Sequence, residues 1–533
     1  MSGLGRASVI LGAGTLVSRV TGLIRSIVLV GLIGSYASEV ADAFGLANQL
    51  PNNIYAVISA GVLTAVIVPQ IVRESTRADG GQRFLSALFT AGTVVLLVAT
   101  LIATLCAPLL IALFADSFNA EQQALATAFA YWCLPQLFFY GLYALLGEAL
   151  NARRVFGPFT WAPVVNNLIS IAGFVAIMLV FGSDLTRVAQ WDAGMIAALG
   201  GTATAGIVIQ AVVLLLFWRR TGLRIRPDFH WRGLGFRNMA RLAGWTTLMV
   251  IVGQIAGLVQ TRIVSEASGA ASSVSVMQNA WLVFMLPYSV IVLSIGTPYF
   301  TQLSEHATAG RTEAVRDDIR QSIRLIGLFV VAALAAVAVA AVPATRVFTN
   351  SAADAAASAP VLLAYLVGLL PLAVIFIIQR TFYAYDDTRT PFLFTLLQGT
   401  LVIASAVIAS HVLTDAWLAA GIALGQSLAS LIQLIVAGIL LSRRLGGIHT
   451  ADWMRSLARF IGAAVPAAAA GWGVYILTGG DDGWTTVDKL YGALGTALIG
   501  AVTAAVYLGV LALVRAPELA PASTLVRRIL RRG

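Results

Sequence analysis

The first apolar segments of the chain carry charged and amide side chains that a lipid-facing helix would exclude. Arg19 and Arg25 lie in the first segment, and Asp42, Pro51 and Asn52 lie in the second. Placing a charge in hydrocarbon costs about 2.5 to 3.5 kcal/mol on insertion scales. We therefore expect these groups to face a polar cavity, which would be the working part of the molecule.

The spacing of these residues predicts the chemistry of that cavity. Ser18, Gly22 and Arg25 are spaced to share one helix face, and Arg19 lies about 100° round from Ser18. The forked donors of arginine match phosphate oxygens, so the pair indicates an anionic, phosphate-bearing substrate. A structural role is the alternative, in which Arg19 and Arg25 pair with Asp42 or helix-end carbonyls, or extend to a membrane interface.

Other kinds of chemistry have little support in the sequence. There is no Gly-Lys-Ser/Thr phosphate loop, and Lys489 is the only lysine. The four histidines lack metal-ligand spacing, the acidic pairs fall in predicted loops, and no Ser or Cys nucleophile motif stands out. Cys106 and Cys133 fall inside apolar segments and are interpreted as small core residues. We expect a transporter and not an enzyme, with no metal and no cofactor.

The composition places these residues in a membrane protein. Of 533 residues 59% are hydrophobic and 11% are charged, against about 25% charged in a soluble domain. The net charge of +10 comes from arginine clusters between apolar runs, which indicates cytoplasmic loops and not a nucleic-acid surface. We therefore expect an all-α polytopic membrane protein.

Fourteen segments are long and apolar enough to span a membrane. They run approximately over 7–33, 41–72, 84–114, 124–150, 159–181, 193–218, 240–263, 274–303, 321–348, 357–384, 391–412, 416–442, 456–478 and 489–515.

Charges in the predicted loops support this count. Every second loop bears arginine, as with the pair Arg153 and Arg154 or the pair Arg443 and Arg444, and the intervening loops carry mainly acidic residues. An even number of spans with both termini in the cytoplasm predicts this alternation. We expect a multi-pass protein of the bacterial cytoplasmic membrane.

An internal repeat divides the segments. Leu50-Pro51 recurs as Leu286-Pro287 and Leu134-Pro135 as Leu370-Pro371, each 236 residues later. We predict an N-terminal six-helix lobe over 1–225, a second six-helix lobe over 226–450, and two further helices with a basic tail over 451–533. Because six is even, the lobes would be parallel repeats about an axis along the membrane normal, as in transporters whose site lies between the halves.

Four prolines recur symmetrically within these segments and are predicted hinges. Pro51, Pro135, Pro287 and Pro371 each remove a backbone donor and free a carbonyl, which bends or softens a helix. Membrane helices tolerate a single proline, but placement in both lobes favours symmetric bending.

Four motifs together resemble one known family. SRVTGLIRSIV, ADAFGLANQLPN, AGVLTAVIVPQIV and ALNARRVFGPFTWAPVVNN are similar to the MurJ (MviN) family of lipid II flippases, in the multidrug/oligosaccharidyl-lipid/polysaccharide exporter superfamily. The likeness extends over essentially the whole chain. It implies alternating access that moves undecaprenyl-pyrophosphate-linked disaccharide-pentapeptide from the inner to the outer leaflet for peptidoglycan synthesis.

The resemblance also implies roles for particular residues. Ser18, Arg19 and Arg25 fall on cavity positions of the family's first helix, and Asp42 falls on the acidic position that opens its second helix. We expect the arginines to bind the pyrophosphate, Ser18 to donate a hydrogen bond, and Asp42 to pair or gate. Asn52 is also a predicted substrate contact.

The sequence departs from the family pattern at three positions. Tyr55 stands where the family often has arginine, and Leu282 and Met285 stand where it often has arginine and glutamate. The stretch NAWLVFMLPYSV looks more like the actinobacterial branch. With fewer arginines the cavity must hold the pyrophosphate with fewer charges or recruit another, and Arg262, near the repeat counterpart of Arg25, is one candidate.

Two other functions stay open. The same fold could export another polyprenyl-linked saccharide or an amphipathic drug, and Arg25→Ala would then leave peptidoglycan synthesis intact. A non-transporting scaffold for the cell-wall machinery would tolerate loss of the cavity charges but need the loop arginines. We expect a monomer that contacts membrane lipid, the lipid-linked cargo and cell-wall synthesis proteins. The sequence does not reveal the driving ion, and drive by the membrane potential is what the family implies.

Overall fold

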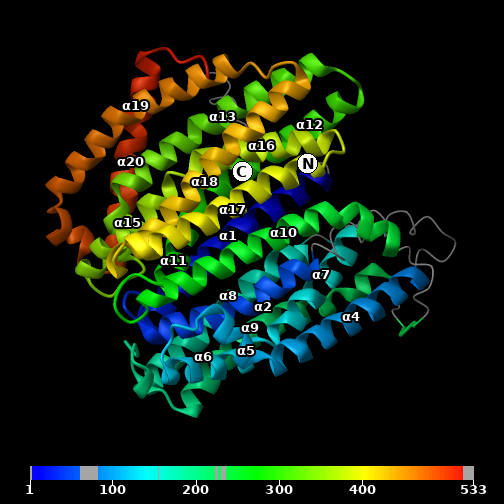
Figure 1. Ribbon diagram of the computed structural model, residues 1–533, viewed down its shortest axis with the longest axis vertical. Coiled ribbons are helices and arrows are strands. Elements are labelled where there is room, and N and C mark those ends of the chain that lie inside the picture. The colour runs from blue at the N-terminus through cyan, green and yellow to red at the C-terminus, as the bar shows by residue number, and fades with distance from the viewer. Residues whose placement is uncertain are drawn as a thin grey trace. The chain divides into compact units, whose positions relative to one another are not determined.

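The computed structural model describes residues 3–59, 82–153, 155, 157–222, 226–229 and 236–519. These residues form helices joined by short links, and no strand occurs among them (Figure 1). The later part of the predicted segment 41–72 and the basic tail beyond residue 519 lie outside the described residues. Contacts divide the chain into two compact units, one of Met1–Gly34 with Ser38–Ser268 and one of Ser35–Ala37 with Gly269–Gly533.

The first unit contains the helices that carry most of the predicted site. They are α1 (Gly3–Ile33), α2 (Glu39–Ile58), α4 (Gln82–Leu105), α5 (Ala107–Phe114), α6 (Ala120–Cys133), α7 (Gln136–Ala152), α8 (Gly157–Phe181), α9 (Ala193–Leu216) and α10 (Phe236–Val264). Within this unit α8 packs against both α1 and α9, and α2 packs against α6 (Figure 1).

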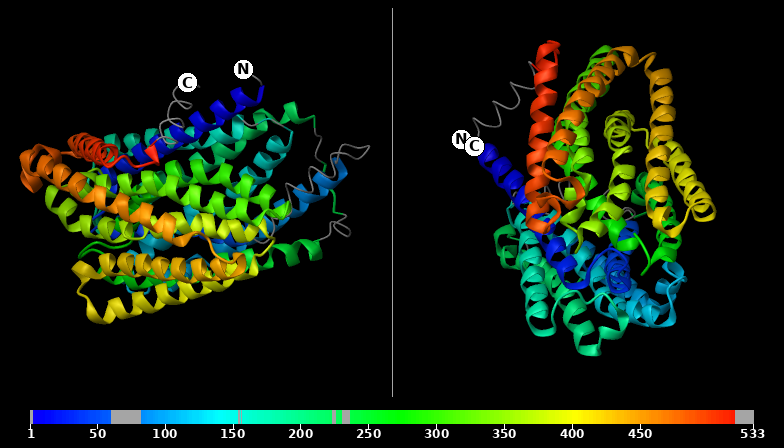
Figure 2. Two further views of the ribbon diagram at one scale, coloured as in Figure 1. Left: turned by 90° about the horizontal axis from the view of Figure 1, so that it is seen from above. Right: turned by 90° about the vertical axis from the view of Figure 1, so that its left-hand side faces the viewer.

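The second unit continues with helices of similar length. They are α11 (Val274–Pro287), α12 (Leu293–Thr308), α13 (Thr312–Val339), α14 (Ala341–Arg346), α15 (Ala352–Leu366), α16 (Leu369–Ala384), α17 (Arg389–Val412), α18 (Asp415–Leu445), α19 (Thr450–Leu477) and α20 (Lys489–Leu513). In Figure 2, α19 and α20 form a hairpin, in orange and red, and both pack against α13.

The predicted all-α membrane fold is confirmed. Within the described residues, twelve helical stretches are long and apolar enough to cross a membrane, and they match the predicted third to fourteenth segments. The first two predicted segments are helical as α1 and α2 where they are described. The total of fourteen spans stays a prediction.

Helices begin at polar caps in the links that the sequence predicted. The side chains of Ser38, Asn119, Asp192 and Asp488 each accept a hydrogen bond from the backbone N–H three residues later, at 2.8 to 3.1 Å. These bonds satisfy donors that a helix leaves unpaired in its first turn. The caps fix where each helix begins and therefore which residues face its neighbours.

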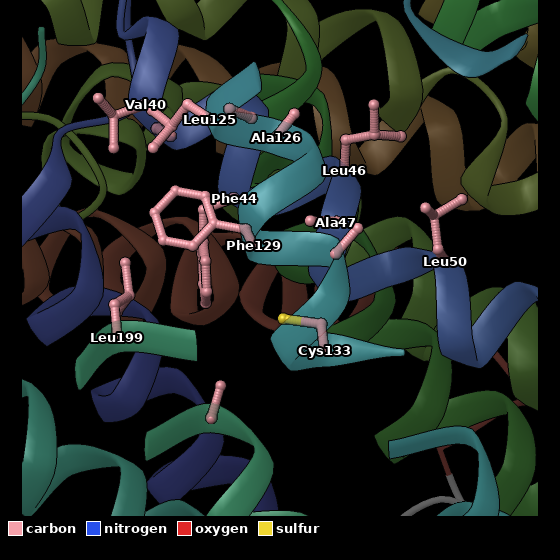
Figure 3. Packing of buried hydrophobic residues seen from close by; sticks show 14 of the residues in the cluster. Val40, Phe44, Leu46, Ala47, Leu50, Leu125, Ala126, Phe129, Cys133 and Leu199 are labelled. Atoms are coloured by element: carbon pink, nitrogen blue, oxygen red, sulfur yellow. The ribbon is translucent and has the colours of Figure 1, made fainter. Parts of the chain in front are cut away.

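The core of the first unit lies where α2 faces α6. Val40, Phe44 and Ala47 of α2 recur at helical spacing on the side that meets α6, and Figure 3 shows Val40 beside Leu125 and Phe44 beside Phe129. The rings of Phe44 and Phe129 meet edge to face with centroids 5.3 Å apart. This packing holds α2, and the polar residues further along it, in a fixed position.

The contact units differ from the predicted lobes in where they divide the chain. Helix α10 opens the predicted second lobe, but it packs against α2 and α5 and belongs to the first unit. The link between α1 and α2 belongs to the second unit, since Ala37 N–H donates to Ala271 at 3.3 Å and the Ser35 hydroxyl donates to the Phe348 carbonyl. A repeat in sequence and a cluster of contacts are different properties, so the lobes over 1–225, 226–450 and 451–533 stay a prediction.

Candidate functional site

Arg19 and Arg25 lie on α1, and both side chains are half-buried. Within the described ranges neither guanidinium makes an ion pair or a hydrogen bond. The Arg25 guanidinium interacts electrostatically with the Tyr140 hydroxyl of α7. The pairing with Asp42 that the sequence left open is therefore not formed, and both arginines keep the capacity to bind an anion.

An amide network fixes the helix that presents Tyr140. The Tyr140 hydroxyl donates to Gln136 Oε1 at 3.4 Å, and Gln136 Nε2 donates to Asn48 Oδ1 and Thr204 Oγ1, each at 3.1 Å. The Thr204 hydroxyl in turn donates to the Trp132 carbonyl at 2.7 Å. Gln136 is 1% exposed. A buried amide with satisfied partners rigidifies its surroundings, and this network joins α2, α6, α7 and α9.

Two pairs of aromatic rings and one carboxylate occur near this part of α7. The ring centroids of Tyr55 and Tyr140 are 6.1 Å apart, and the half-buried Glu148 interacts electrostatically with the Tyr55 hydroxyl. Tyr143 stacks on Phe159 at 4.9 Å and donates to its carbonyl at 2.6 Å. Tyr55 therefore places a phenol group near a carboxylate in this part of the first unit.

Ser18 lies where α1 meets α8. Asn167 Nδ2 donates to the Ser18 carbonyl and to Thr21 Oγ1, each at 3.0 Å. A Cβ on Gly22 would lie 3.4 Å from Asn167 Nδ2, which is ordinary van der Waals contact, so α1 and α8 are closely packed here. The structure thus gives the Ser18 backbone a packing role, and the role of its hydroxyl toward cargo stays a prediction.

Asn52 is exposed on α2, three residues before Tyr55 and beside the buried Pro51. Residues three apart lie on neighbouring parts of a helix surface. Asn52 is therefore placed on the same side of α2 as Tyr55, and its contact with substrate stays a prediction.

Asp42 lies in a second polar cluster at the start of α2. Its side chain is fully buried, and Oδ2 accepts a hydrogen bond of 2.6 Å from the Ser268 hydroxyl. Gln122 Nε2 of α6 donates to Ser268 Oγ at 2.8 Å and to the Glu39 carbonyl at 3.0 Å. The cluster therefore attaches the residues that follow α10 to α2 and α6.

Arg262, the candidate for an additional cavity charge, pairs with a carboxylate. It lies in the last turn of α10 and forms an ion pair with Asp116, in the link between α5 and α6. Beside this pair, the hydroxyls of Ser117 and Ser265 are 2.7 Å apart. Arg262 thus pairs with Asp116 on an exposed part of the first unit, and its contact with substrate stays a prediction.

Three of the four predicted hinge prolines lie at or next to helix breaks, and Pro51 lies within a continuous helix. Pro135 separates α6 from α7, and Pro371 lies in the first turn of α16, after the break that follows α15. Pro287 ends α11, where a π-helical turn over Tyr288–Val292 begins, and Pro51 lies inside α2. Proline removes an intrahelical hydrogen bond, which explains the breaks. Movement at these positions stays a prediction.

Sequence analysis missed three polar residues near the first helix. Tyr140 interacts electrostatically with Arg25, Gln136 bonds to Tyr140, and Asn167 bonds to the Ser18 carbonyl. Each lies in a predicted membrane segment and carries a polar group, and Gln136 directly follows the predicted hinge Pro135. A polar residue within an apolar segment is itself a signal of a functional or packing role. Among the described residues, no group of three or more His, Cys, Asp or Glu side chains is placed to hold a metal ion.

Two proteins of known family are similar to this chain in sequence. The chain is 26% identical over 484 residues to a probable lipid II flippase MurJ from Rhizobium tropici, covering 87% of this chain and 85% of that protein. It is 29% identical over 402 residues to a probable lipid II flippase MurJ from Rhizobium meliloti (strain 1021), covering 72% of this chain and 71% of that one.

Solved structures share the fold. A lipid II flippase MurJ in an inward closed conformation matches with a TM-score of 0.70 at 19% identity, over 93% of this chain and 98% of that one. An inward-facing multidrug resistance MATE family transporter of the MOP superfamily matches with a TM-score of 0.64 at 15% identity, over 82% of this chain and 98% of that one. The family model described as lipid II flippase MurJ matches residues 33–487, and the chain therefore belongs to the MurJ family.

Proposed function

We propose that this protein is a lipid II flippase, which moves undecaprenyl-pyrophosphate-linked disaccharide-pentapeptide from the inner to the outer leaflet of the cytoplasmic membrane by alternating access. Membership of the MurJ family supports this function. The observation in the molecule that carries it is the pair Arg19 and Arg25, two half-buried guanidinium groups without a carboxylate partner among the described residues. Such groups are stabilised when a phosphate-bearing ligand arrives.

In this proposal Arg25 binds the pyrophosphate from α1, with the Tyr140 hydroxyl beside it. Arg19, Ser18 and Asn52 extend the contact along α1 and α2. The neutral Tyr55 near Glu148 lowers the positive charge of the site relative to the family pattern. The pyrophosphate therefore depends more strongly on Arg25 than it would in a site with more arginines.

The cluster around Asp42 has a different role in the proposal. Asp42, Ser268 and Gln122 form hydrogen bonds that must be exchanged if α10 leaves α2 and α6, and the Arg262–Asp116 pair must break in the same movement. We assign this cluster to gating and not to direct cargo binding. Hydrogen bonds of this kind are suited to a switch because each contributes only about 1 to 3 kcal/mol.

We also propose that the protein crosses the cytoplasmic membrane many times, with both termini in the cytoplasm. The twelve candidate spans support a multi-pass membrane protein, and the alternating loop arginines support a cytoplasmic location for both termini. Bending at Pro51, Pro135, Pro287 and Pro371 would accompany the change of access. A single chain contains all these residues, so we propose a monomer as the transport unit, working alongside cell-wall synthesis proteins.

The test is surface exposure of lipid II in a bacterial strain whose own flippase is depleted. Wild type should restore exposure, and Arg25→Ala should fail while reaching the membrane in equal amount. Arg455→Ala is the matched control, because it removes the same charge from a side chain that is 78% exposed. If wild type also fails in a related actinobacterium, the proposal is wrong and a different lipid-linked cargo or drug becomes the leading candidate. Full rescue by Arg25→Ala would favour the scaffold.

A further inference from the structure

Arg380 of α16 is held in a cage of aromatic rings. Its guanidinium carbon lies 5.1 Å from the ring centroids of Phe300 and Phe376 and 6.0 Å from that of Tyr383. Phe300 belongs to α12, so the cage spans two helices of the second unit. Rings bind the faces of a guanidinium group, which leaves its N–H edge to make other contacts.

The guanidinium group of Arg380 has no anionic partner within the described part of the chain. It forms no ion pair and no hydrogen bond there, and none of its nitrogens is both buried and unpaired. Its nitrogens are therefore accessible to a ligand, although the side chain as a whole is half-buried.

Arg380 differs in this respect from the other arginines of the second unit. Each buried or half-buried arginine described there bonds to an oxygen: Arg316 to Leu445, Arg320 to Asp317, Arg324 to Glu518 and Arg346 to Thr486. Arg444 also lies over aromatic rings, those of Tyr385 and Phe382, but it forms an ion pair with Asp387. At Arg444, therefore, the aromatic rings occur together with a carboxylate partner, whereas Arg380 has the rings without a carboxylate among the described residues.

A tyrosine hydroxyl lies within electrostatic range of Arg380. It belongs to Tyr288, and no hydrogen bond joins it to the guanidinium group, both side chains being among those described. Tyr288 is the first residue of the π-helical turn Tyr288–Val292, which directly follows Pro287. Short π-helical turns occur frequently at functional sites, where the extra residue redirects side chains. Gln379 Nε2 donates to the Tyr383 hydroxyl at 2.7 Å, which fixes the orientation of one cage ring.

We propose that Arg380 and Tyr288 form a phosphate-binding subsite in the second unit, which takes the pyrophosphate of the lipid-linked cargo. A forked cation and a phenol hydroxyl within electrostatic range of each other are both donors of the kind that bind phosphate oxygens. The identity of this ligand rests on the proposed function. The phosphate of an ordinary membrane lipid has the same chemistry. It is the other source to test, because Arg380 lies only four residues before the end of α16.

The experiment measures binding to the full-length protein in detergent by native mass spectrometry, with undecaprenyl pyrophosphate and phosphatidylglycerol as separate probes. Arg380→Gln should weaken binding of undecaprenyl pyrophosphate by about tenfold or more, as expected for loss of charge-assisted hydrogen bonds. Arg380→Lys should lose less because it keeps the charge but not the fork. Tyr288→Phe should have a smaller effect of the same sign.

Arg444→Gln is the matched control, because it removes a ring-bound arginine that already has a carboxylate partner, and its binding should stay within about twofold of wild type. Equal binding of undecaprenyl pyrophosphate by wild type and Arg380→Gln overturns the subsite. Loss of phosphatidylglycerol binding alone overturns the assignment to cargo. If Arg380→Gln fails to fold, Arg380→Lys decides, and unchanged binding of undecaprenyl pyrophosphate by that variant overturns the forked contact.

The experiments distinguish failure of the proposed flippase function from failure of the proposed phosphate-binding subsite. Wild type would then not expose lipid II in the depleted strain, while the binding difference between wild type and Arg380→Gln would still report on the subsite.

Discussion

The Ser268 hydroxyl donates a hydrogen bond of 2.6 Å to the buried carboxylate of Asp42, across 226 residues of sequence. It joins the residues that follow α10 to the start of α2. Because Ser268 also accepts from Gln122, one hydroxyl couples three parts of the first unit. This small group therefore holds the unit in the arrangement described above.

Removing the Ser268 hydroxyl should destabilise this arrangement. Ser268→Ala takes a donor from a buried carboxylate, which we expect to cost about 1 to 3 kcal/mol in the free energy of unfolding. A double-mutant cycle with Asp42→Asn, followed by thermal unfolding in detergent, measures the coupling. Ser117→Ala is the control, because its hydroxyl contacts Ser265 and not Asp42. Additive effects of the two changes would contradict the direct interaction.

Replacing Gln136 should affect stability more than it affects charge. Gln136→Leu keeps the bulk of the side chain but removes the donor to Asn48 and Thr204 and the acceptor for Tyr140. We expect a loss of about 1 to 3 kcal/mol in the free energy of unfolding and reduced transport, since Tyr140 is then less well oriented toward Arg25. Gln136→Glu separates the two effects, because it keeps an acceptor for Tyr140. Unchanged melting temperatures for both variants would contradict a structural role for the network.

Glu518 makes stability depend on pH. Burial opposes its ionisation, but hydrogen bonds from Arg324 at 2.7 Å and Ser456 at 2.8 Å, with the nearby Arg324 charge, outweigh burial and lower the pKa of the carboxyl below its ordinary 4.5. A lowered folded pKa gives stability that is fully present above the ordinary pKa and is lost as pH falls through the folded value.

Glu518→Gln should therefore lower the melting temperature at about pH 7, and the difference from wild type should shrink progressively below about pH 4.5. Thermal unfolding across pH measures this. Glu313→Gln is the control, because that carboxylate is 72% exposed and its pairing with Arg316 contributes little. A constant difference between wild type and Glu518→Gln at all pH values would contradict the prediction.

Gly296 lets α12 approach the ring cage of Arg380. A Cβ at this position would lie 2.4 Å from Cε1 of Phe376, so Gly296→Ala must displace that ring. We expect about 1 to 3 kcal/mol of destabilisation from overpacking and weaker binding of undecaprenyl pyrophosphate. Gly257→Ala is the control, since a Cβ there meets open space and alanine favours the helix. Binding by Gly296→Ala equal to wild type would show that the position of Phe376 does not matter.

The sequence predicted helix positions better than it predicted partners. Apolar length and polar links marked the described helices, and the repeated Leu-Pro pairs marked the breaks at Pro135 and Pro287 and near Pro371. Both signals are local, because they depend on the preference of a short stretch for lipid or for a bend.

Partners depend on packing between distant residues. Arg25 was predicted from its cost in hydrocarbon, but nothing near it in sequence indicates Tyr140, which reaches it through the packing of α7. Arg262 was assigned by the repeat, yet Asp116 neutralises it. Of the three rings around Arg380, Phe376 and Tyr383 lie on its own helix, but Phe300 comes from α12, about 80 residues away in sequence.

The assignment of Ser35–Ala37 to the second unit means that the backbone passes from one unit to the other at three places: after Gly34, before Ser38 and after Ser268. A change in the arrangement of the two units would therefore require changes in backbone angles at three chain crossings and not at one. Gly34 and Gly269 adjoin two of them with φ angles of +73° and +76°, a left-handed conformation that strains other residues. Replacing either glycine would restrict the backbone at one of these crossings. The turnover rate would then decrease more than the affinity for cargo.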